Sequence, residues 1–340
     1  ETASTVSSRG VYIFPLSNKE DGALDNFQVC SFDMFTVPWG QLPDQEWAEE
    51  DKNPSCLGEF VWTGFDYLGE PTPYNTDLTI LTNFHDEEAR AKAEKELAEK
   101  GAVATPSRSS YFGIIDLAGF PKDRYWLYKS RWSSEPVLHL MPHWNWAGRE
   151  GRITPVQAYT NCVSAELFVN GKSYGRKTKG TKEYRFLWDN VIYEPGTVKV
   201  IGLTADGKTI ENTITTTGSA AKILMACEYG QGPSTDFGGD CVPASTQTSS
   251  TDNILFVDVK VADKDGNMVP TACDEIKFIV SGAGEIVAVD AGDATCHTPF
   301  HSDEIKAFNG LASVIVRRTS KGAITVKAVC DGLESCEIEL

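Results

Sequence analysis

The sequence lacks any apolar run of about 18 residues, so we expect no transmembrane helix. Its first twenty residues also lack the basic and apolar regions of a signal peptide. The chain starts with Glu1 rather than with methionine. Together these features predict a piece of a longer precursor, in which any targeting segment lies elsewhere.

Cysteine pairs with the spacing of a metal site are absent as well. The chain has nine cysteines and no CxxC pair, which disfavours a zinc framework. In an oxidising compartment Cys227 could pair with Cys241, or Cys330 with Cys336. Buried free thiols explain the pattern equally well, so the connectivity stays open.

A calcium loop is only half present. Residues 263–267, DKDGN, have the acidic spacing of such a loop. The twelfth position counted from Asp263 is Asp274 rather than a bidentate glutamate, and Pro270 intervenes. We therefore predict a hairpin turn at this position and no metal site.

Positive charge is scarce, because 31 lysines and arginines stand against 48 aspartates and glutamates, for a net charge of -17. Nucleic-acid affinity depends on cations that displace counterions from phosphates, so we expect no nucleic-acid partner. The composition, 41% apolar and 23% charged, is typical of a folded protein, and 340 residues predict two or three domains.

Two helices are predicted in the first 133 residues. One spans Asp44 to Asp51, where Pro43 precedes an acidic first turn. The other spans residues 86–100, with acids at its start and lysines toward its end. Its apolar face contains only Ala89, Ala93 and Leu97. That face is too thin for a core helix, so we interpret this helix as a solvated surface insertion.

A short buried strand is predicted at Phe60, Val61 and Trp62. These β-prone apolar residues are bounded by Gly58 and Gly64. We expect a functional loop directly after the strand.

From about residue 134 the sequence changes to short alternating segments separated by turn signals. The predicted strands are Val137 to Met141, Ser164 to Val169, Tyr184 to Trp188 and Thr197 to Thr204. A Thr/Ser/Gly/Ala stretch at 213–221 is typical of a linker. Five further strand-like runs follow, namely FVDVKVADKDG, IKFIVSG, IVAVDAG, LASVIVRR and AITVKAV. This pattern predicts two successive β-sandwiches.

Several long motifs point to one family. They are ETASTVSSRGVY at 1–12, GEFVWTGFDYLGEPTPY at 58–74, SRSSYFGIIDLAGFPKDRYWLYKSRW at 107–132, HLMPHWNWAGREG at 139–151, AELFVNGKSYG at 165–175, and VDAGDAT with PFHSDEIKAFNG near the end. The chain resembles the C-terminal portion of glycoside hydrolase family 2, in particular its bacterial β-galactosidase-like members. The resemblance covers essentially the whole chain.

The resemblance implies a multidomain fold in which residues 1–133 are the C-terminal elements of a (β/α)8 catalytic barrel. Residues 134–217 would form a β-sandwich, and residues 218–340 a C-terminal immunoglobulin-like β-sandwich. Such a barrel has a nucleophilic glutamate at the end of strand seven, whose surroundings Glu1 matches. FVWTGFDY matches strand eight, so Trp62 would be the aromatic platform under the bound sugar.

Other candidates have a structural alternative beside the functional one. Asp66 would contact the sugar, or else cap a loop. Arg9 orients the nucleophile or anchors its loop, and the anchor is favoured. For Glu70 the default explanation is that it shapes a Gly-Glu-Pro turn.

The cluster His139, His143, Trp144 and Trp146 could display the two tryptophans on one strand face as a second sugar platform. Packing between the barrel end and the first sandwich is the favoured interpretation. Pro142 lies between the two histidines and disfavours a helix, so a metal pair is not expected.

The resemblance implies a retaining glycoside hydrolase of terminal β-linked sugars, with β-galactosides as the first expectation. A retaining enzyme needs a second carboxyl group, expected in an Asn-Glu pair, and no such pair occurs in the chain. The chain alone should therefore be inactive. The expected partners are a carbohydrate substrate and the remainder of the barrel, with a homo-oligomer left open.

No cofactor and no membrane partner are expected, and a periplasmic, secreted or cell-surface bacterial location is favoured. The alternative from another class is a noncatalytic carbohydrate-binding or adhesion fragment built from the two sandwiches. Exposed coplanar aromatic side chains on a sandwich face would distinguish it from the enzyme.

Overall fold

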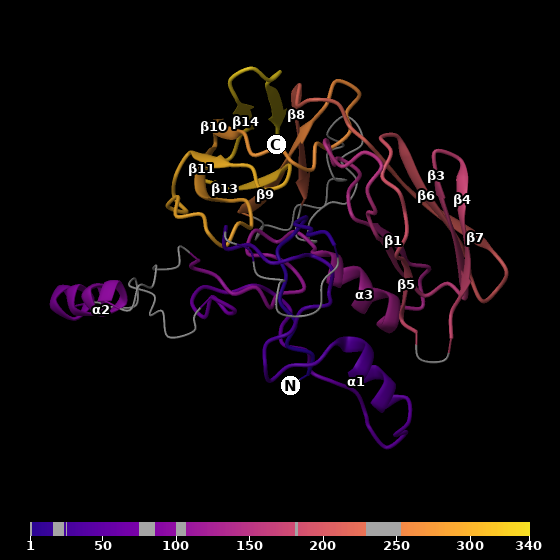
Figure 1. Cartoon of the computed structure of the whole chain (residues 1–340). Coiled ribbons are helices and arrows are strands. Elements are labelled where there is room, and N and C mark those ends of the chain that lie inside the picture. Colours follow the sequence, from indigo (N-terminus) through magenta and orange to yellow (C-terminus); the bar gives the residue numbers. More distant parts are fainter. Residues whose placement is uncertain are drawn as a thin grey trace.

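The computed structural model describes residues 2–15, 24, 26–74, 86–99, 107–180, 183–228 and 253–340. Three parts follow one another along the chain. In Figure 1 the sheets of the C-terminal part lie above the N-terminal region, and the sheets of the middle part lie on the right of the view.

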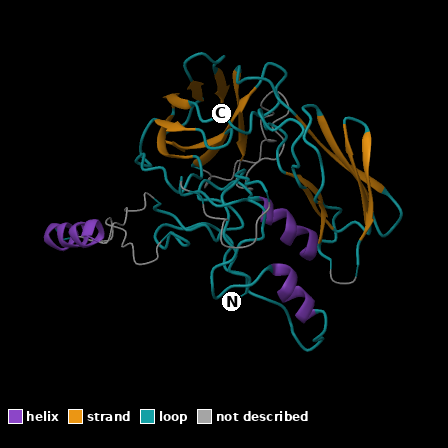
Figure 2. Ribbon diagram, viewed as in Figure 1, coloured by secondary structure: helices purple, strands orange, loops and turns teal. Residues whose placement is uncertain are grey.

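The described residues of the N-terminal region, within 2–133, form three helices: α1 (Pro43–Glu50), α2 (Glu87–Glu99) and α3 (Asp123–Trp132). Its described residues otherwise form loops, as Figure 2 shows, joined by isolated bridges rather than by a continuous sheet. Two of these bridges are parallel, between Thr2 and Val61 and between Phe65 and Ile115. The barrel predicted for this region stays a prediction.

Helices α1 and α2 confirm the two sequence predictions to within one residue at each end. Helix α2 stands away from the rest of the chain in Figure 1, and its described side chains are mostly exposed. Three ion pairs run along it at i,i+4 spacing, Arg90–Glu94, Lys92–Glu96 and Lys95–Glu99. It is therefore the solvated surface helix that its thin apolar face predicted.

Helix α3 was not predicted from the sequence. Its residues DRYWLYKSRW are rich in aromatics, which are indifferent helix formers. Leu127 and Tyr128 are buried on its inner face, so tertiary packing accounts for the helix where local propensity does not.

The prediction of a buried strand at residues 60–62 is wrong. Phe60 is 87% exposed, and Val61 takes part in a single bridge. Among the described residues this segment pairs on one side only, with Thr2, so its other side is uncovered and no ladder extends along it.

The middle part forms two antiparallel sheets. Their strands are β1 (Leu138–Met141), β2 (Val156–Thr160), β3 (Ser164–Val169), β4 (Lys172–Thr178), β5 (Arg185–Trp188), β6 (Thr197–Leu203) and β7 (Thr209–Thr215). The sheet orders are β1-β2-β5 and β4-β3-β6-β7. Side chains of both sheets share one buried core, for example Phe186 from the first and Leu167 from the second.

All four strands predicted in the middle part are present as β1, β3, β5 and β6. Strand β2 was missed because all five of its residues are buried, so it shows no alternation. Strand β4 was missed because it is largely exposed and polar. The linker predicted at 213–221 is partly wrong, since β7 continues to Thr215.

The described residues of the C-terminal part also form two antiparallel sheets. Their strands are β8 (Lys222–Glu228), β9 (Ile254–Ala262), β10 (Glu275–Gly282), β11 (Gly284–Asp290), β12 (Glu304–Lys306), β13 (Leu311–Arg318), β14 (Ile324–Val329) and β15 (Cys336–Glu339). The orders are β11-β13-β9-β8 and β12-β10-β14-β15, and one core lies between the sheets. All five predicted runs are strands, while the short β12 and β15 and the preceding β8 were missed.

The hairpin turn predicted at 263–267 is confirmed. The Asp263 carboxylate accepts backbone N–H bonds from Gly218, Asp265 and Asn267, at 3.0, 3.0 and 2.9 Å. Burial raises the pKa of Asp263, but these hydrogen bonds outweigh burial and leave its pKa below the usual value. Its oxygens therefore serve the turn.

Among the described cysteines, Cys330 and Cys336 have free thiols, so the structure contains no disulfide between them. Cys241 lies outside the described residues, which leaves the pairing with Cys227 untested. Within the described ranges no helix is long and apolar enough to cross a membrane. The same ranges contain no group of three or more His, Cys, Asp or Glu side chains that could hold a metal ion.

Two isoleucines on β10 test the C-terminal core. Ile276 is fully buried, whereas Ile279 is 48% exposed. We predict that Ile276→Ala lowers the free energy of unfolding by about 3 kcal/mol, because it leaves a cavity in the core. Ile279→Ala, the matched control, should cost less than about 1 kcal/mol. Urea denaturation followed by circular dichroism measures both, and equal losses would contradict the two-layer core.

Candidate active site

The candidate site begins at the segment that follows Glu1. Glu1 itself lies outside the described residues, and its neighbour Thr2 is held tightly. The Thr2 N–H donates to the Phe60 carbonyl at 3.0 Å, and the Trp62 N–H donates to the Thr2 carbonyl at 3.1 Å. The Thr2 hydroxyl also donates to the Glu59 carboxylate at 2.8 Å. These bonds bring the residue after Glu1 next to the predicted sugar platform.

Two buried cations hold the backbone of residues 3–7. Arg124 donates from Nη1 to the carbonyl of Thr5 at 2.8 Å and from Nη2 to that of Ala3 at 3.3 Å. Lys122 donates from Nζ to the carbonyl of Ser7 at 2.7 Å. Buried carbonyls outside a regular sheet need such donors, and charged donors make the stronger hydrogen bonds.

Trp62 is 38% exposed, and its indole N–H donates to the Tyr67 hydroxyl at 3.1 Å. That hydroxyl in turn donates to the Glu70 carboxylate. Burial, followed by the Glu70 hydrogen bond, raises the pKa of Tyr67 to about 12, so Tyr67 stays a donor at neutral pH. The indole is thus oriented by its edge while part of its surface stays open to solvent, as a sugar platform requires.

Tyr67 was not singled out in the sequence, although it lies within the family motif. Glu70 has a left-handed backbone, with φ of 38°, which agrees with its predicted role in a turn. The structure adds a second role, because the Glu70 side chain completes the chain of hydrogen bonds from Trp62.

Asp66 is 8% exposed, and other groups occupy both of its oxygens. Lys122 lies 2.6 Å from Oδ2, and the Gly113 N–H donates to Oδ1 at 2.7 Å. Burial raises the pKa of Asp66, although the Lys122 ammonium acts in the opposite direction. The sugar contact predicted for Asp66 stays a prediction, and these contacts favour the alternative in which it anchors a loop.

Arg9 points toward the C-terminal sheets. Its Nε donates to the Asp116 carboxylate at 2.7 Å, and its Nη2 donates to the Ala291 carbonyl at 2.6 Å. The guanidinium also lies over the rings of Phe120 and Phe308, at 5.0 and 5.3 Å from their centroids. Arg9 therefore has the geometry of an anchor.

The histidine and tryptophan cluster is a packing cluster. Trp144 is fully buried and donates from its indole to the Glu194 carbonyl at 2.9 Å. His143 and Trp146 stack with centroids 4.1 Å apart, and Phe14 meets Trp146 edge to face. Display of both tryptophans on one strand face is wrong, because β1 ends at Met141 and Trp144 is enclosed in the core.

Asp123 joins the N-terminal region to β1, and sequence reasoning missed it. Its carboxylate accepts hydrogen bonds from Tyr12 at 2.5 Å and Ser31 at 2.6 Å, and it lies 2.7 Å from His139 Nε2. Burial raises its pKa, but these partners outweigh burial and lower it. A cavity of about 270 Å³ adjoins this cluster. Since both oxygens are occupied, Asp123 is a structural group here.

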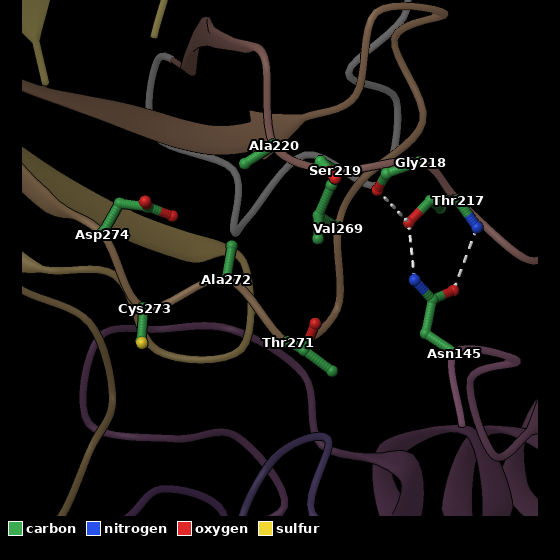
Figure 3. Close-up of a pocket in the computed structure, with 10 residues that line it drawn as sticks. All are labelled: Asn145, Thr217, Gly218, Ser219, Ala220, Val269, Thr271, Ala272, Cys273 and Asp274. Carbon is green, nitrogen blue, oxygen red and sulfur yellow. Dashed lines mark hydrogen bonds between the residues drawn. The ribbon is translucent and has the colours of Figure 1, made fainter. Parts of the chain in front are cut away.

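A larger open pocket of about 600 Å³ lies between the middle and C-terminal sheets (Figure 3). On one side Asn145 and Thr217 satisfy each other, through Asn145 Nδ2 to Thr217 Oγ1 at 2.7 Å and Thr217 N–H to Asn145 Oδ1 at 3.0 Å. Among the described residues that line it, Asp274 is the one carboxylate and none has an aromatic ring. This described lining therefore offers neither paired acids nor a sugar platform.

Known proteins match this chain along its length. The model of glycoside hydrolase family 2 C-terminal domain 5 matches residues 243–339, and that of a domain of unknown function matches residues 151–211. β-Galactosidase BoGH2A of Bacteroides ovatus is 34% identical over 350 residues, covering 100% of this chain and 36% of that protein. The chain belongs to glycoside hydrolase family 2.

Other relatives agree with this family 2 assignment. A β-glucuronidase of Formosa agariphila is 27% identical over 233 residues, covering 67% of this chain and 22% of that protein. The crystal structure of a β-glycosidase from Bacteroides vulgatus superposes with a TM-score of 0.76 at 25% identity, covering 99% of this chain and 40% of that chain. The family 2 chain thus spans 36% of the length of BoGH2A and less of the glucuronidase.

The Asp66–Lys122 pair of the family 2 chain provides a stability test. Asp66→Asn leaves Lys122 as an uncompensated buried charge, so we predict a loss of about 3 kcal/mol in the free energy of unfolding. The exposed Asp265→Asn is the matched control and should change it by less than about 0.5 kcal/mol. Chemical denaturation measures both. Unchanged stability of Asp66→Asn would contradict the anchoring role and would favour the predicted contact between Asp66 and the sugar.

His143 gives a pH test. Burial lowers its pKa to about 4, with the Asp123 carboxylate opposing that shift. An unfolded histidine titrates near about 6.5, so below that pH the unfolded chain binds a proton that the folded chain does not. Stability is therefore present above about pH 6.5 and is lost as the pH falls toward 4.

We predict that His143 accounts for about 2 kcal/mol of the stability lost between pH 7 and pH 5. His143→Gln should lose that much less over the same interval, whereas the exposed His301→Gln should lose as much as the parent. Denaturation curves at the two pH values measure the difference. Parallel losses in all three proteins would contradict the burial of a neutral His143.

Proposed function

We propose that this chain is the C-terminal part of a retaining glycoside hydrolase that removes terminal β-linked sugars, in the first place β-galactosides. The observation that carries the proposal is the pairing of Thr2 with the segment at residues 60–62, which ends in a partly exposed Trp62. A glutamate at position 1 would thereby lie beside an aromatic sugar platform. Relatives named β-galactosidase and β-glucuronidase support the reaction class.

The N-terminal region would complete a (β/α)8 barrel together with residues outside this chain. Its two parallel bridges, Thr2–Val61 and Phe65–Ile115, support this proposal, because barrel strands are parallel. So does its exposed apolar surface, to which Leu57, Phe60, Phe65 and Leu68 contribute. Soluble proteins rarely gather large exposed apolar side chains without a partner, so the remainder of the barrel is the partner we propose for them.

In the proposed mechanism Glu1 attacks the anomeric carbon and forms a glycosyl-enzyme intermediate. A second carboxyl group, about 5 Å away, protonates the leaving oxygen and later activates water. The chain has no Asn-Glu pair to supply it, so the acid/base would come from the rest of the barrel. Without its proton donor, Glu1 forfeits a factor of roughly 100 to 10,000, and the chain alone would be inactive.

Within this mechanism Trp62 would stack on the apolar face of the sugar ring. Its hydrogen bond to Tyr67, which is itself fixed by Glu70, sets the angle of the indole before substrate binds. Asp66 and Lys122 would not contact the sugar but would fix the loop that follows Trp62. The sheet pairs of the middle part and of the C-terminal part, which we propose are immunoglobulin-like sandwiches, would support the barrel from outside.

A noncatalytic sugar-binding role for the sandwiches has less support. Such modules use exposed aromatic side chains on a sheet face. In the described residues after 133, the exposed large hydrophobic side chains include one aromatic, Phe256. One ring does not make a coplanar platform, so the enzyme is the function we propose.

The nucleophile can be tested in the full-length protein that carries this chain. We predict that Glu1→Gln lowers kcat by on the order of 1,000-fold or more, since it removes the attacking group. The exposed Glu135→Gln is the control and should retain kcat. A 2-fluoro sugar inactivator should label Glu1 in the parent, as mass spectrometry of peptides would show. Label on another residue would overturn the assignment.

The platform can be tested by removing its ring. We predict that Trp62→Ala raises KM about tenfold, because stacking on the sugar contributes roughly 1 kcal/mol or more. Trp132→Ala, which removes another half-exposed tryptophan from helix α3, should leave KM unchanged. Steady-state kinetics on an aryl β-galactoside separates the two. An equal change in both variants would exclude Trp62 as the platform.

A further inference from the structure

One loop of the C-terminal sheets reaches into the N-terminal region. This loop, Asp290 to Asp293, follows β11 and contacts three separate segments. Ala291 accepts the Arg9 hydrogen bond at 2.6 Å, and Asp293 accepts one from Gln28 Nε2 at 2.7 Å. Asp290 Oδ2 lies 3.9 Å from Arg108 Nη2. We call this segment the 290–293 loop.

The loop fits closely against a buried pair. Asp116 accepts Arg9 Nε through Oδ2 and the Phe120 N–H through Oδ1, at 2.7 and 2.8 Å. Gly292 has φ of +79°, and a Cβ placed on it would lie 2.0 Å from Asp116 Oδ2. Only glycine allows the loop this close, since backbone and carboxylate leave no room for a methyl group.

Arg9 is held from two sides. The 290–293 loop holds its side chain, and Asn309 Nδ2 donates to its backbone carbonyl at 2.6 Å. Gly10 approaches Asn309 as well, because a Cβ on Gly10 would lie 3.2 Å from the Asn309 Cβ. The C-terminal sheets thus fix the end of the segment that begins at Glu1.

The segment between Arg9 and Glu1 is also fixed. Lys122 binds the Ser7 carbonyl, and Arg124 binds the carbonyls of Thr5 and Ala3. The backbone N–H and the carbonyl of Thr2 are both hydrogen-bonded. A displacement of Arg9 therefore acts on a segment whose contacts are continuous as far as the residue after Glu1. Such precision matters for catalysis, because a nucleophile displaced by about 1 Å can lose a factor of roughly 100 in rate.

We propose that the 290–293 loop is a positioning element for catalysis, which holds the segment that follows Glu1 in place through Arg9 and Asp116. The proposal rests on the proposed function, since it needs Glu1 to be the nucleophile. On this proposal the C-terminal sheets influence the rate of the reaction by holding the segment that follows Glu1.

The test uses two glycines in the full-length protein. Gly292→Ala and Gly332→Ala both place alanine at a positive φ, +79° and +81°, but a Cβ at Gly332 meets no atom within 4 Å. The pair therefore shares the backbone strain and differs in the clash with Asp116. We expect Gly292→Ala to lower kcat by about tenfold or more while KM changes less than about twofold. Gly332→Ala should retain kcat.

A double-mutant cycle connects the effect to Asp116. Asp116→Ala removes the carboxylate that the new methyl group would meet, so Gly292→Ala should lower kcat little further in that background. The rate at which a 2-fluoro sugar labels Glu1 should fall in parallel with kcat. If Gly292→Ala fails to fold, Arg9→Lys replaces it, because lysine cannot keep both the Asp116 and Ala291 bonds.

The inference is overturned if Gly292→Ala has a normal kcat, if it acts on KM alone, or if its effect adds to that of Asp116→Ala. Assays are run where circular dichroism shows each variant fully folded, so lost stability is not mistaken for lost positioning. A Glu1→Gln protein that still turns over would instead refute the proposed function. An inactive Glu1→Gln with a fully active Gly292→Ala refutes the positioning role alone.

Discussion

The N-terminal region depends on buried cations that donate to backbone carbonyls. Residues 2–9 do not lie in a continuous sheet, so the carbonyls of Ala3, Thr5 and Ser7 lack the partners that a ladder would supply. Arg124 and Lys122 supply them instead, from a position more than a hundred residues later in the chain. Burial lowers the pKa of Lys122, and Asp66 opposes that shift by stabilising the charged form. Arg124 and the Lys122–Asp66 ion pair thereby order the segment next to Glu1.

This way of ordering a segment has an asymmetric cost. A buried cation gains little net stability from its partner, but losing the partner leaves an unpaired charge in a dry environment. Conformational precision is therefore tied to an intact set of donors and acceptors. The regular sheets that follow are different, because their ladders contain many equivalent hydrogen bonds and their cores many apolar contacts. The least redundant part of the chain is the part that would carry chemistry.

The sequence predicted the sheets better than the site region. Strands such as β6 and β13 alternate or run apolar between turn residues, and both were found to within a residue. Strand β2 and helix α3 were missed because tertiary burial, rather than local pattern, decides them. Phe60 was predicted to be buried but is exposed. Hydrophobic periodicity and composition cannot show which other segments pack against a given segment.

The residues of the candidate site could be predicted from the sequence only in part. Motif similarity pointed to Trp62 and Glu1, but spacing alone could not show that Tyr67 orients the indole. The roles of Asp123 and of the 290–293 loop join residues that lie far apart in sequence, and a single sequence contains no signal for such contacts.

Helix α2 stands apart from the candidate site and from the sheets. It stands clear of the other elements in Figure 1, and the ion pairs that support it lie within the helix itself. A fluorophore, an affinity tag or a surface-immobilisation handle attached to its exposed face would not touch the sheets or the segment next to Glu1. The helix is thus a natural point of attachment for optical or single-molecule work on the intact protein.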